Sequence, residues 1–199
     1  VGVFTPDTPL ANDAGMAAVT APRDRAAVRR ALQAAGYTGE KLLFMSPSDI
    51  QLNANASEVA ADALRQSGME VDFVAMDWGT LLQRRNKKEP AAQGGWHAYV
   101  AFNTGVDLLN PAVHPMLRGD GKSGVYGWSE NPAIEEMRSA WFDAPDLAAQ
   151  QAIARRMQET AFQHVPYIPL GQVAQLTSFR ETVTGMLKGV PVFWNIRKG

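Results

Sequence analysis

In the first half of the chain, segments with apolar residues at helical spacing alternate with short continuous apolar runs. Residues 24–35 and 57–66 carry apolar side chains three or four positions apart, which predicts two amphipathic helices. Short apolar runs at 41–45 and 71–76 predict two strands, the first of them covered on both faces. Asp77 can cap a third helix directly after the second strand. This order of helices and strands favours a parallel sheet with right-handed crossovers.

The second half predicts one more strand and then two helices. The strand is expected at 96–102, and residues 103–130 follow as a long segment punctuated by glycine and proline. Loops of this length are usually functional or mobile. Two helices, one capped by Asn131 and one that begins near Asp146, should bury the stripes Ile134, Met137 and Trp141, and Leu147, Ile153, Ala154, Met157 and Ala161. Residues 165–170 are extended but hold two prolines, which excludes a central strand.

Composition narrows the class of protein. The 199 residues are 46% apolar and 20% charged, as in an ordinary folded chain. With a net charge of −1, the chain has no excess of basic residues that would favour binding to nucleic acid or to an anionic membrane. No apolar run approaches the ~18 residues of a membrane span. The absence of cysteine excludes disulfides, thiolate metal sites and a cysteine nucleophile.

Both ends of the chain have the apolar pattern of internal segments. Residues 1–4 and 192–196 are apolar and extended, and such runs seldom form a natural free terminus. The chain begins without an initiating methionine or a signal segment. We therefore expect it to be a piece of a larger protein.

Motifs for catalysis, nucleotide binding and metal binding do not stand out. The chain has no Gly-x-Ser-x-Gly elbow, and Gly-Asp-Gly-Lys-Ser-Gly at 119–124 lacks the spacing of a phosphate loop, so we expect a glycine turn there. His97, His114 and His164 are far apart and predict no metal site, and His97 should be a hydrogen-bonded structural residue. Glu135 and its neighbour at 136 suit the positive end of a helix better than an acid–base pair. We predict no cofactor.

The segment at 102–111 is more informative because it directly follows the third strand. Ligands of open α/β sheets gather beyond the carboxyl ends of the strands. Asp107 is the only acid between Glu89 and Asp120, and it lies near a glycine among apolar neighbours. Its carboxylate could cap a short helix that begins near Leu108, or it could anchor a ligand. From the residues alone, both interpretations stay open.

Two tryptophans flank this segment. Trp96 precedes it, and Trp128 follows it in the glycine-rich stretch Val-Tyr-Gly-Trp, where two aromatic side chains are hard to explain as core. Aromatic walls around a few fixed polar groups are typical of a small-molecule cleft.

The order of these motifs resembles a known family. The pieces are Ala-Leu-Gln-Ala-Ala-Gly-Tyr at 31–37, Gly-Met-Glu-Val at 68–71, Asp-Trp at 77–78, the stretch from Asp107 to Pro111, Asn-Pro at 131–132, and Val-Pro-Tyr-Ile-Pro-Leu at 165–170. Together they resemble the C-terminal lobe of the family 5 extracellular solute-binding proteins. These are the dipeptide-, oligopeptide- and nickel-type binding components of bacterial ABC importers.

The resemblance implies a fold and a division of the chain. The fold would be an α/β, periplasmic-binding-protein-like lobe with a largely parallel sheet flanked by helices. Residues 1–22 would lead in from the hinge and a missing lobe, 23–170 would form the ligand-binding lobe, and 171–199 would return toward the missing lobe. The lobes would close at a hinge formed by residues 3–4 and 165–172.

The resemblance also implies a function without catalysis. The protein would capture a peptide or a similar small polar solute in a cleft between its lobes and deliver it to the ABC permease in the membrane. It would act in the periplasm or outside the cell, with no nucleic acid partner. An α/β hydrolase or transferase completed by the missing half, or a sensory ligand-binding module, are the alternatives.

Residue by residue, the resemblance singles out Asp107. It stands four positions before Pro111, where peptide-binding members carry an Asp that holds the α-ammonium group of the ligand. Many members have a Trp shortly before that Asp, and this chain has Asn103 and Thr104 instead. The predicted ligand-binding residues are therefore Asp107, Asn103, Thr104, Trp128 and Trp96.

Overall fold

The contacts of the chain gather in two units. The computed structural model describes residues 1–187 and 192–199. One unit combines Val1–Ala18 with Thr104–Gly199, and the other is Val19–Asn103. This is a division by contacts within the chain, so the predicted boundaries at residues 22 and 170 stay predictions.

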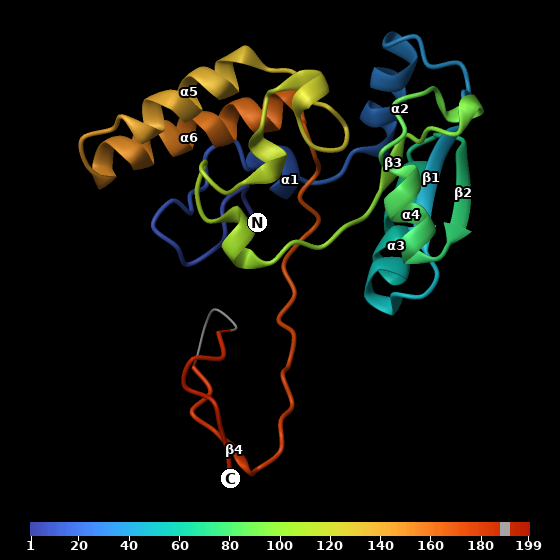
Figure 1. Ribbon diagram of the computed structural model, residues 1–199. Helices are drawn as coiled ribbons and strands as arrows, with labels where there is room; N and C mark the ends of the chain where they lie inside the picture. Colours follow the sequence, from blue (N-terminus) through green and yellow to red (C-terminus); the bar gives the residue numbers. More distant parts are fainter. Residues whose placement is uncertain (188–191) are drawn as a thin grey trace. The chain divides into compact units, whose positions relative to one another are not determined.

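The unit Val19–Asn103 is built on the predicted parallel sheet. Its strands β1 (Leu42–Pro47), β2 (Val71–Met76) and β3 (Ala98–Tyr99) lie in the order β2-β1-β3 (Figure 1). Strand β1 runs parallel to both neighbours. Its consecutive residues Phe44 and Met45, which point to opposite faces, are 3% and 0% exposed. The prediction that this strand is covered on both faces is confirmed.

Strand β3 is shorter than the predicted run at 96–102. It pairs with β1 only through Ala98 and Tyr99. Just before it, His97 accepts a hydrogen bond at Nδ1 from the Leu43 amide at 2.8 Å, so a side chain takes the place of a ladder carbonyl. His97 is thus the hydrogen-bonded structural residue that the sequence predicts.

Three helices accompany this sheet, namely α2 (Arg25–Ala34), α3 (Gln51–Gln66) and α4 (Trp78–Arg84). As predicted, Asp77 caps α4 by accepting the Thr80 amide at 2.9 Å. Helix α3 begins six residues before the predicted start, in a polar turn where the Gln51 side chain donates to Asn55 Oδ1 at 2.6 Å. Its inner face packs on the sheet through a small cluster around Phe44, Ala61 and Val100.

The amphipathic helix predicted at 24–35 is present, but no other element covers its apolar face. Helix α2 forms and is capped by Asp24, but none of its residues is buried, and Val28 is 43% exposed. Helical spacing fixes which side chains share a face, and it does not determine whether another element covers that face.

The second unit is mainly helical. Helices α5 (Pro132–Phe142) and α6 (Leu147–His164) pack together. Asn131 caps α5 as predicted, and Asp146 caps α6. Most of the predicted stripes are buried or half-buried. Leu147 is the exception and is 50% exposed, because it is the first residue of α6.

The first residues of the chain run through the core of this unit. They are irregular apart from the short helix α1 (Ala17–Thr20). Val3 and Phe4 are 2% exposed and belong to the same cluster as Leu117 and as residues of α5 and α6 such as Met157. Residues 3–4 are therefore part of the core of this unit.

Buried side chains satisfy the backbone of this N-terminal segment. Gln158, fully buried on α6, accepts the Val3 amide at Oε1 (3.0 Å) and donates from Nε2 to the carbonyls of Asn12 (3.0 Å) and Ala14 (2.8 Å). On the other side, His114 Nε2 lies 2.8 Å from the Val3 carbonyl oxygen, and the Tyr167 hydroxyl lies 3.4 Å from it. Both polar groups of Val3 thus find partners more than 100 positions away.

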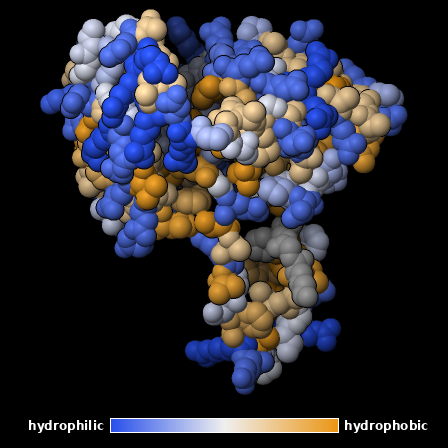
Figure 2. Space-filling model, turned by 180° about the vertical axis from the view of Figure 1, so that it is seen from behind, coloured by the Kyte–Doolittle hydropathy of each residue, from blue (hydrophilic) through white to orange (hydrophobic). Residues whose placement is uncertain are grey.

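Residues 171–182 are exposed. Residues 171–180 form no helix or strand, and β4 (Val183–Thr184) pairs antiparallel with β5 (Arg197–Lys198). Several large apolar side chains here face solvent, among them Leu176 at 97%, Phe193 at 76% and Trp194 at 86% exposure. Figure 2 shows apolar surface on this segment at the bottom of the view.

The Gln158→Leu variant should destabilise this unit. Leucine fills a similar volume but leaves the Val3 amide and two carbonyls without partners, which should cost about 3 kcal/mol of unfolding free energy. Urea unfolding measures the loss. Gln163→Leu, on the exposed side of the same helix, should change stability by less than about 0.5 kcal/mol. Equal effects of the two substitutions would contradict the role given to Gln158.

Burial of His114 predicts a pH dependence of stability. Its Nδ1 is buried without a hydrogen-bond partner, and burial lowers its pKa from 6.5 to about 4. Between these values the unfolded chain binds a proton that the folded chain does not. The unfolding free energy should therefore fall as pH decreases from 6.5 toward 4, by up to about 3 kcal/mol.

The pH dependence is measured by unfolding at several pH values. His114→Gln should remove most of this decline, and His164→Gln, at an exposed histidine, should leave it in place. A decline that survives in His114→Gln would refute the assignment.

Candidate functional site

The acid that the sequence singles out lies in a short, tightly bonded turn. Asp107 belongs to the 3₁₀ turn Gly105–Leu108, and Thr104 precedes this turn as its cap. The Asp107 carboxylate accepts two hydrogen bonds, from the Thr104 hydroxyl at 2.8 Å and from the Thr104 amide at 3.2 Å. The predicted helix that begins near Leu108 with Asp107 as its cap is wrong, because the turn begins at Gly105, Thr104 is its cap, and Asp107 is the third residue inside it. The ligand-anchor interpretation of Asp107 stays a prediction.

The bonds within the turn occupy only one oxygen of the Asp107 carboxylate. Both hydrogen bonds from Thr104 end on Oδ2 of Asp107. A carboxylate has two oxygens with about four acceptor positions in all. The bonds from Thr104 thus leave Oδ1 available to a ligand.

The N-terminal segment fixes the position of this turn. The Thr5 hydroxyl donates to the Gly105 carbonyl at 2.6 Å, and the Thr5 amide donates to the Leu108 carbonyl at 3.2 Å. A Cβ on Gly105 would lie 3.2 Å from the Thr5 methyl carbon, so the two segments approach closely. The turn that carries Asp107 is held at both ends by a residue 100 positions earlier.

Asp107 carries a charge without a cationic partner. Its residue is exposed, and none of the ion pairs among the described residues includes it. The sequence holds no lysine or arginine between Lys88 and Arg118. The local environment therefore suits a positively charged ligand group.

The other predicted site residues are distributed over both units. Trp128 lies in the same unit as Asp107, half-buried, with φ of 48°. Trp96 and Asn103 lie in the unit Val19–Asn103, where Asn103 is exposed. Trp96 donates from Nε1 to the Arg85 carbonyl at 3.1 Å and meets Tyr99 edge-on at 5.1 Å. Among these residues, hydrogen bonds join Thr104 and Asp107.

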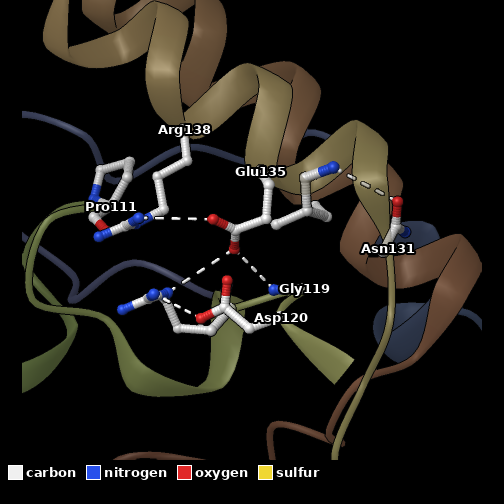
Figure 3. Close-up of polar contacts among 8 residues, drawn as sticks. Pro111, Gly119, Asp120, Asn131, Glu135 and Arg138 are labelled. Atoms are coloured by element: carbon white, nitrogen blue, oxygen red, sulfur yellow. Dashed lines mark hydrogen bonds and ion pairs between the residues drawn. The ribbon is translucent and has the colours of Figure 1, made fainter. Parts of the chain in front are cut away.

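A charged network that the sequence analysis missed secures the long segment after Asp107 (Figure 3). Glu135 on α5 accepts the Gly119 amide at Oε1 (2.7 Å), and the same oxygen lies 3.7 Å from Arg118 Nε. Its other oxygen pairs with Arg138 at 3.4 Å, and Arg138 also donates to the Pro111 carbonyl at 2.9 Å. Arg118 forms a further ion pair with Asp120.

This network attaches the middle of the segment 103–130 to helix α5. Two arginines and two acids balance in charge and join α5 to both ends of the stretch 111–120. The glycine turn expected at 119–124 is present as the 3₁₀ turn Gly121–Ser123. Glu135 stands in the first turn of its helix, as predicted, but its partners could not be read from local spacing, apart from Arg138 three positions on.

The described residues hold neither a metal-binding group nor a membrane-spanning helix. Within residues 1–187 and 192–199, no group of three histidine or acidic side chains could hold a metal ion. No helix of the described part of the chain is long and apolar enough to cross a membrane.

The Glu135→Gln variant should loosen the long segment. The neutral amide keeps the size of the side chain but loses the charge that faces two guanidinium groups, which should cost about 1–2 kcal/mol. Thermal unfolding measures the change. Glu136→Gln removes the same charge from the exposed neighbouring position and should be close to neutral. Similar losses in both variants would point to a general charge effect instead of the network.

Comparison with known proteins gives the family context. The chain is 33% identical over 165 residues to a probable peptide ABC transporter periplasmic-binding protein, y4tO of Sinorhizobium fredii, a match that covers 82% of this chain and 31% of that protein. The chain thus spans about a third of the length of this curated relative. No family model matches the chain.

Solved structures of peptide-binding proteins share the fold of this chain. The dipeptide-binding protein of Pseudoalteromonas sp. SM9913, solved with Met-Leu, aligns with a TM-score of 0.72 at 17% identity, over 100% of this chain and 39% of that chain. The periplasmic binding protein DppA of Helicobacter pylori, solved with the peptide STSA, aligns with a TM-score of 0.60 at 18% identity, over 85% of this chain and 33% of that chain. The predicted α/β periplasmic-binding-protein-like fold is thereby confirmed. Over about a third of their length, the chain is thus similar in sequence to a probable peptide ABC transporter periplasmic-binding protein and in fold to solved peptide-binding proteins, which agrees with the resemblance of its motif order to the family 5 solute-binding proteins.

Proposed function

We propose that this chain is part of the solute-binding component of a bacterial ABC importer. The protein captures a peptide, or a similar small polar solute with an amine, and delivers it to the permease subunits in the membrane. The observation that carries this proposal is the 33% identity over 165 residues to a probable peptide ABC transporter periplasmic-binding protein. The names of the relatives also support a periplasmic or extracellular location and a role in binding without catalysis.

In this proposal, Asp107 binds the cationic end of the ligand. Its support is the exposed carboxylate without an ion-pair partner, on a turn that Thr5 holds in place. A charge-assisted hydrogen bond to an ammonium is about twice as strong as a neutral one, which suits an anchor. Trp128, Trp96 and Asn103 remain proposed as further parts of the binding surface.

Two further features fit a protein with a second lobe. The proposed hinge segments, residues 3–4 and 165–172, meet where the Tyr167 hydroxyl lies 3.4 Å from the Val3 carbonyl oxygen. The exposed apolar side chains after residue 170, such as Leu176 and Trp194, would be covered by the part of the longer protein that the relatives possess and this chain does not span.

The test is peptide binding by the full-length protein that contains these residues. Isothermal calorimetry with a panel of dipeptides and tripeptides, beginning with Met-Leu, should find a ligand. Asp107→Asn should then weaken binding by about ten- to a hundredfold, because the ligand ammonium loses its charged partner. An N-acetylated form of the same peptide should lose a similar factor on the unchanged protein.

Asp146→Asn is the matched control for charge and for capping. Asp146 caps α6 by accepting the Ala149 amide at 2.8 Å, and its substitution should leave the affinity unchanged. Failure of the whole panel to bind would contradict the proposed function. Normal affinity in Asp107→Asn would contradict only the role of Asp107.

A further inference from the structure

The Thr104 hydroxyl is committed to one partner. It donates to Asp107 Oδ2 at 2.8 Å, and the Thr104 amide donates to the same oxygen at 3.2 Å. Since a hydroxyl has a single hydrogen, Thr104 has none left to donate to a ligand. Its hydroxyl therefore acts on Asp107, which changes the role that the resemblance implied for position 104.

We propose that Thr104 is a positioning residue, which holds the Asp107 carboxylate by Oδ2 so that Oδ1 faces the ammonium group of the ligand. The proposal rests on the proposed function and deepens it. Thr104 sets the orientation of the anchor, and Asp107 makes the contact.

A carboxylate needs such a constraint. The terminal torsion of an aspartate side chain is broad, so an unrestrained Asp107 would present either oxygen over a range of directions. Two donors on one oxygen restrict this torsion before a ligand arrives. Pre-organisation of this kind removes an ordering cost that each binding event would otherwise include.

Hydrogen bonds connect the turn that carries Asp107 to the core of its unit. Thr5 holds the carbonyls of Gly105 and Leu108, and these residues bracket Asp107. Two positions before Thr5, the backbone of Val3 is held by Gln158 and His114 in the core. The Thr104–Asp107 pair thus sits on a turn whose backbone has fixed neighbours.

The experiment measures peptide affinity in the full-length protein, with a dipeptide that wild type binds as probe. Thr104→Val keeps the backbone amide and the shape of the side chain but removes the hydroxyl. It should weaken binding about five- to tenfold, mainly through faster dissociation. Thr104→Ser restores the hydroxyl and should bring the affinity back to within about twofold of wild type.

A double-mutant cycle separates positioning from general stability. If Thr104 acts through Asp107, then Thr104→Val should have no further effect on affinity in an Asp107→Asn background. Thr38→Val is the matched control, because Thr38 makes the same pair of bonds, from its hydroxyl and its amide, to the carboxylate of Glu40. That substitution should leave the affinity at the wild-type value.

The outcomes distinguish this inference from the proposed function. If Asp107→Asn weakens binding and Thr104→Val does not, the positioning role is refuted and the anchor stands. Equal losses from Thr104→Val in the presence and absence of the Asp107 charge would also refute positioning and assign Thr104 a structural role. If neither substitution affects affinity, the proposed role of Asp107 fails as well.

Discussion

The backbone of Val3 is the constraint on which the rest of the helical unit depends. An amide and a carbonyl buried in an apolar core require partners, and Gln158 and His114 supply them from distant parts of the sequence. Once Val3 is fixed, Thr5 lies where it can hold the turn Gly105–Leu108. That turn carries Asp107, so the orientation of an exposed carboxylate follows from hydrogen bonds made in the core.

Local rules predicted much of this architecture. The apolar runs at 41–45 and 71–76 predict the strands β1 and β2, and Asp77 and Asn131 cap the helices that the sequence assigns to them. These features depend on neighbours within a few residues, and so they can be read from spacing. The glycine turn near Gly121 belongs to the same group.

Features that depend on distant partners could not be predicted in this way. The bond from the Val3 amide to Gln158 joins residues 155 positions apart, and the bond from the Gly119 amide to Glu135 joins residues 16 positions apart. The exposure of Val28 is the reverse case, in which a clear local pattern finds no covering element. At the candidate site, the sequence singled out both members of the Thr104–Asp107 pair but could not show that one holds the other.

These interactions lead to one account of how the chain works. A core that fixes its first residues also fixes a turn, the turn presents a carboxylate, and the carboxylate is proposed to meet the amine of a captured peptide. The most direct test is a crystal structure of the full-length protein with a bound dipeptide. The account predicts the ligand ammonium within hydrogen-bond distance of Asp107 Oδ1, with the Thr104 hydroxyl still on Oδ2. A ligand whose ammonium is held by another group, with Asp107 facing bulk water, would contradict it.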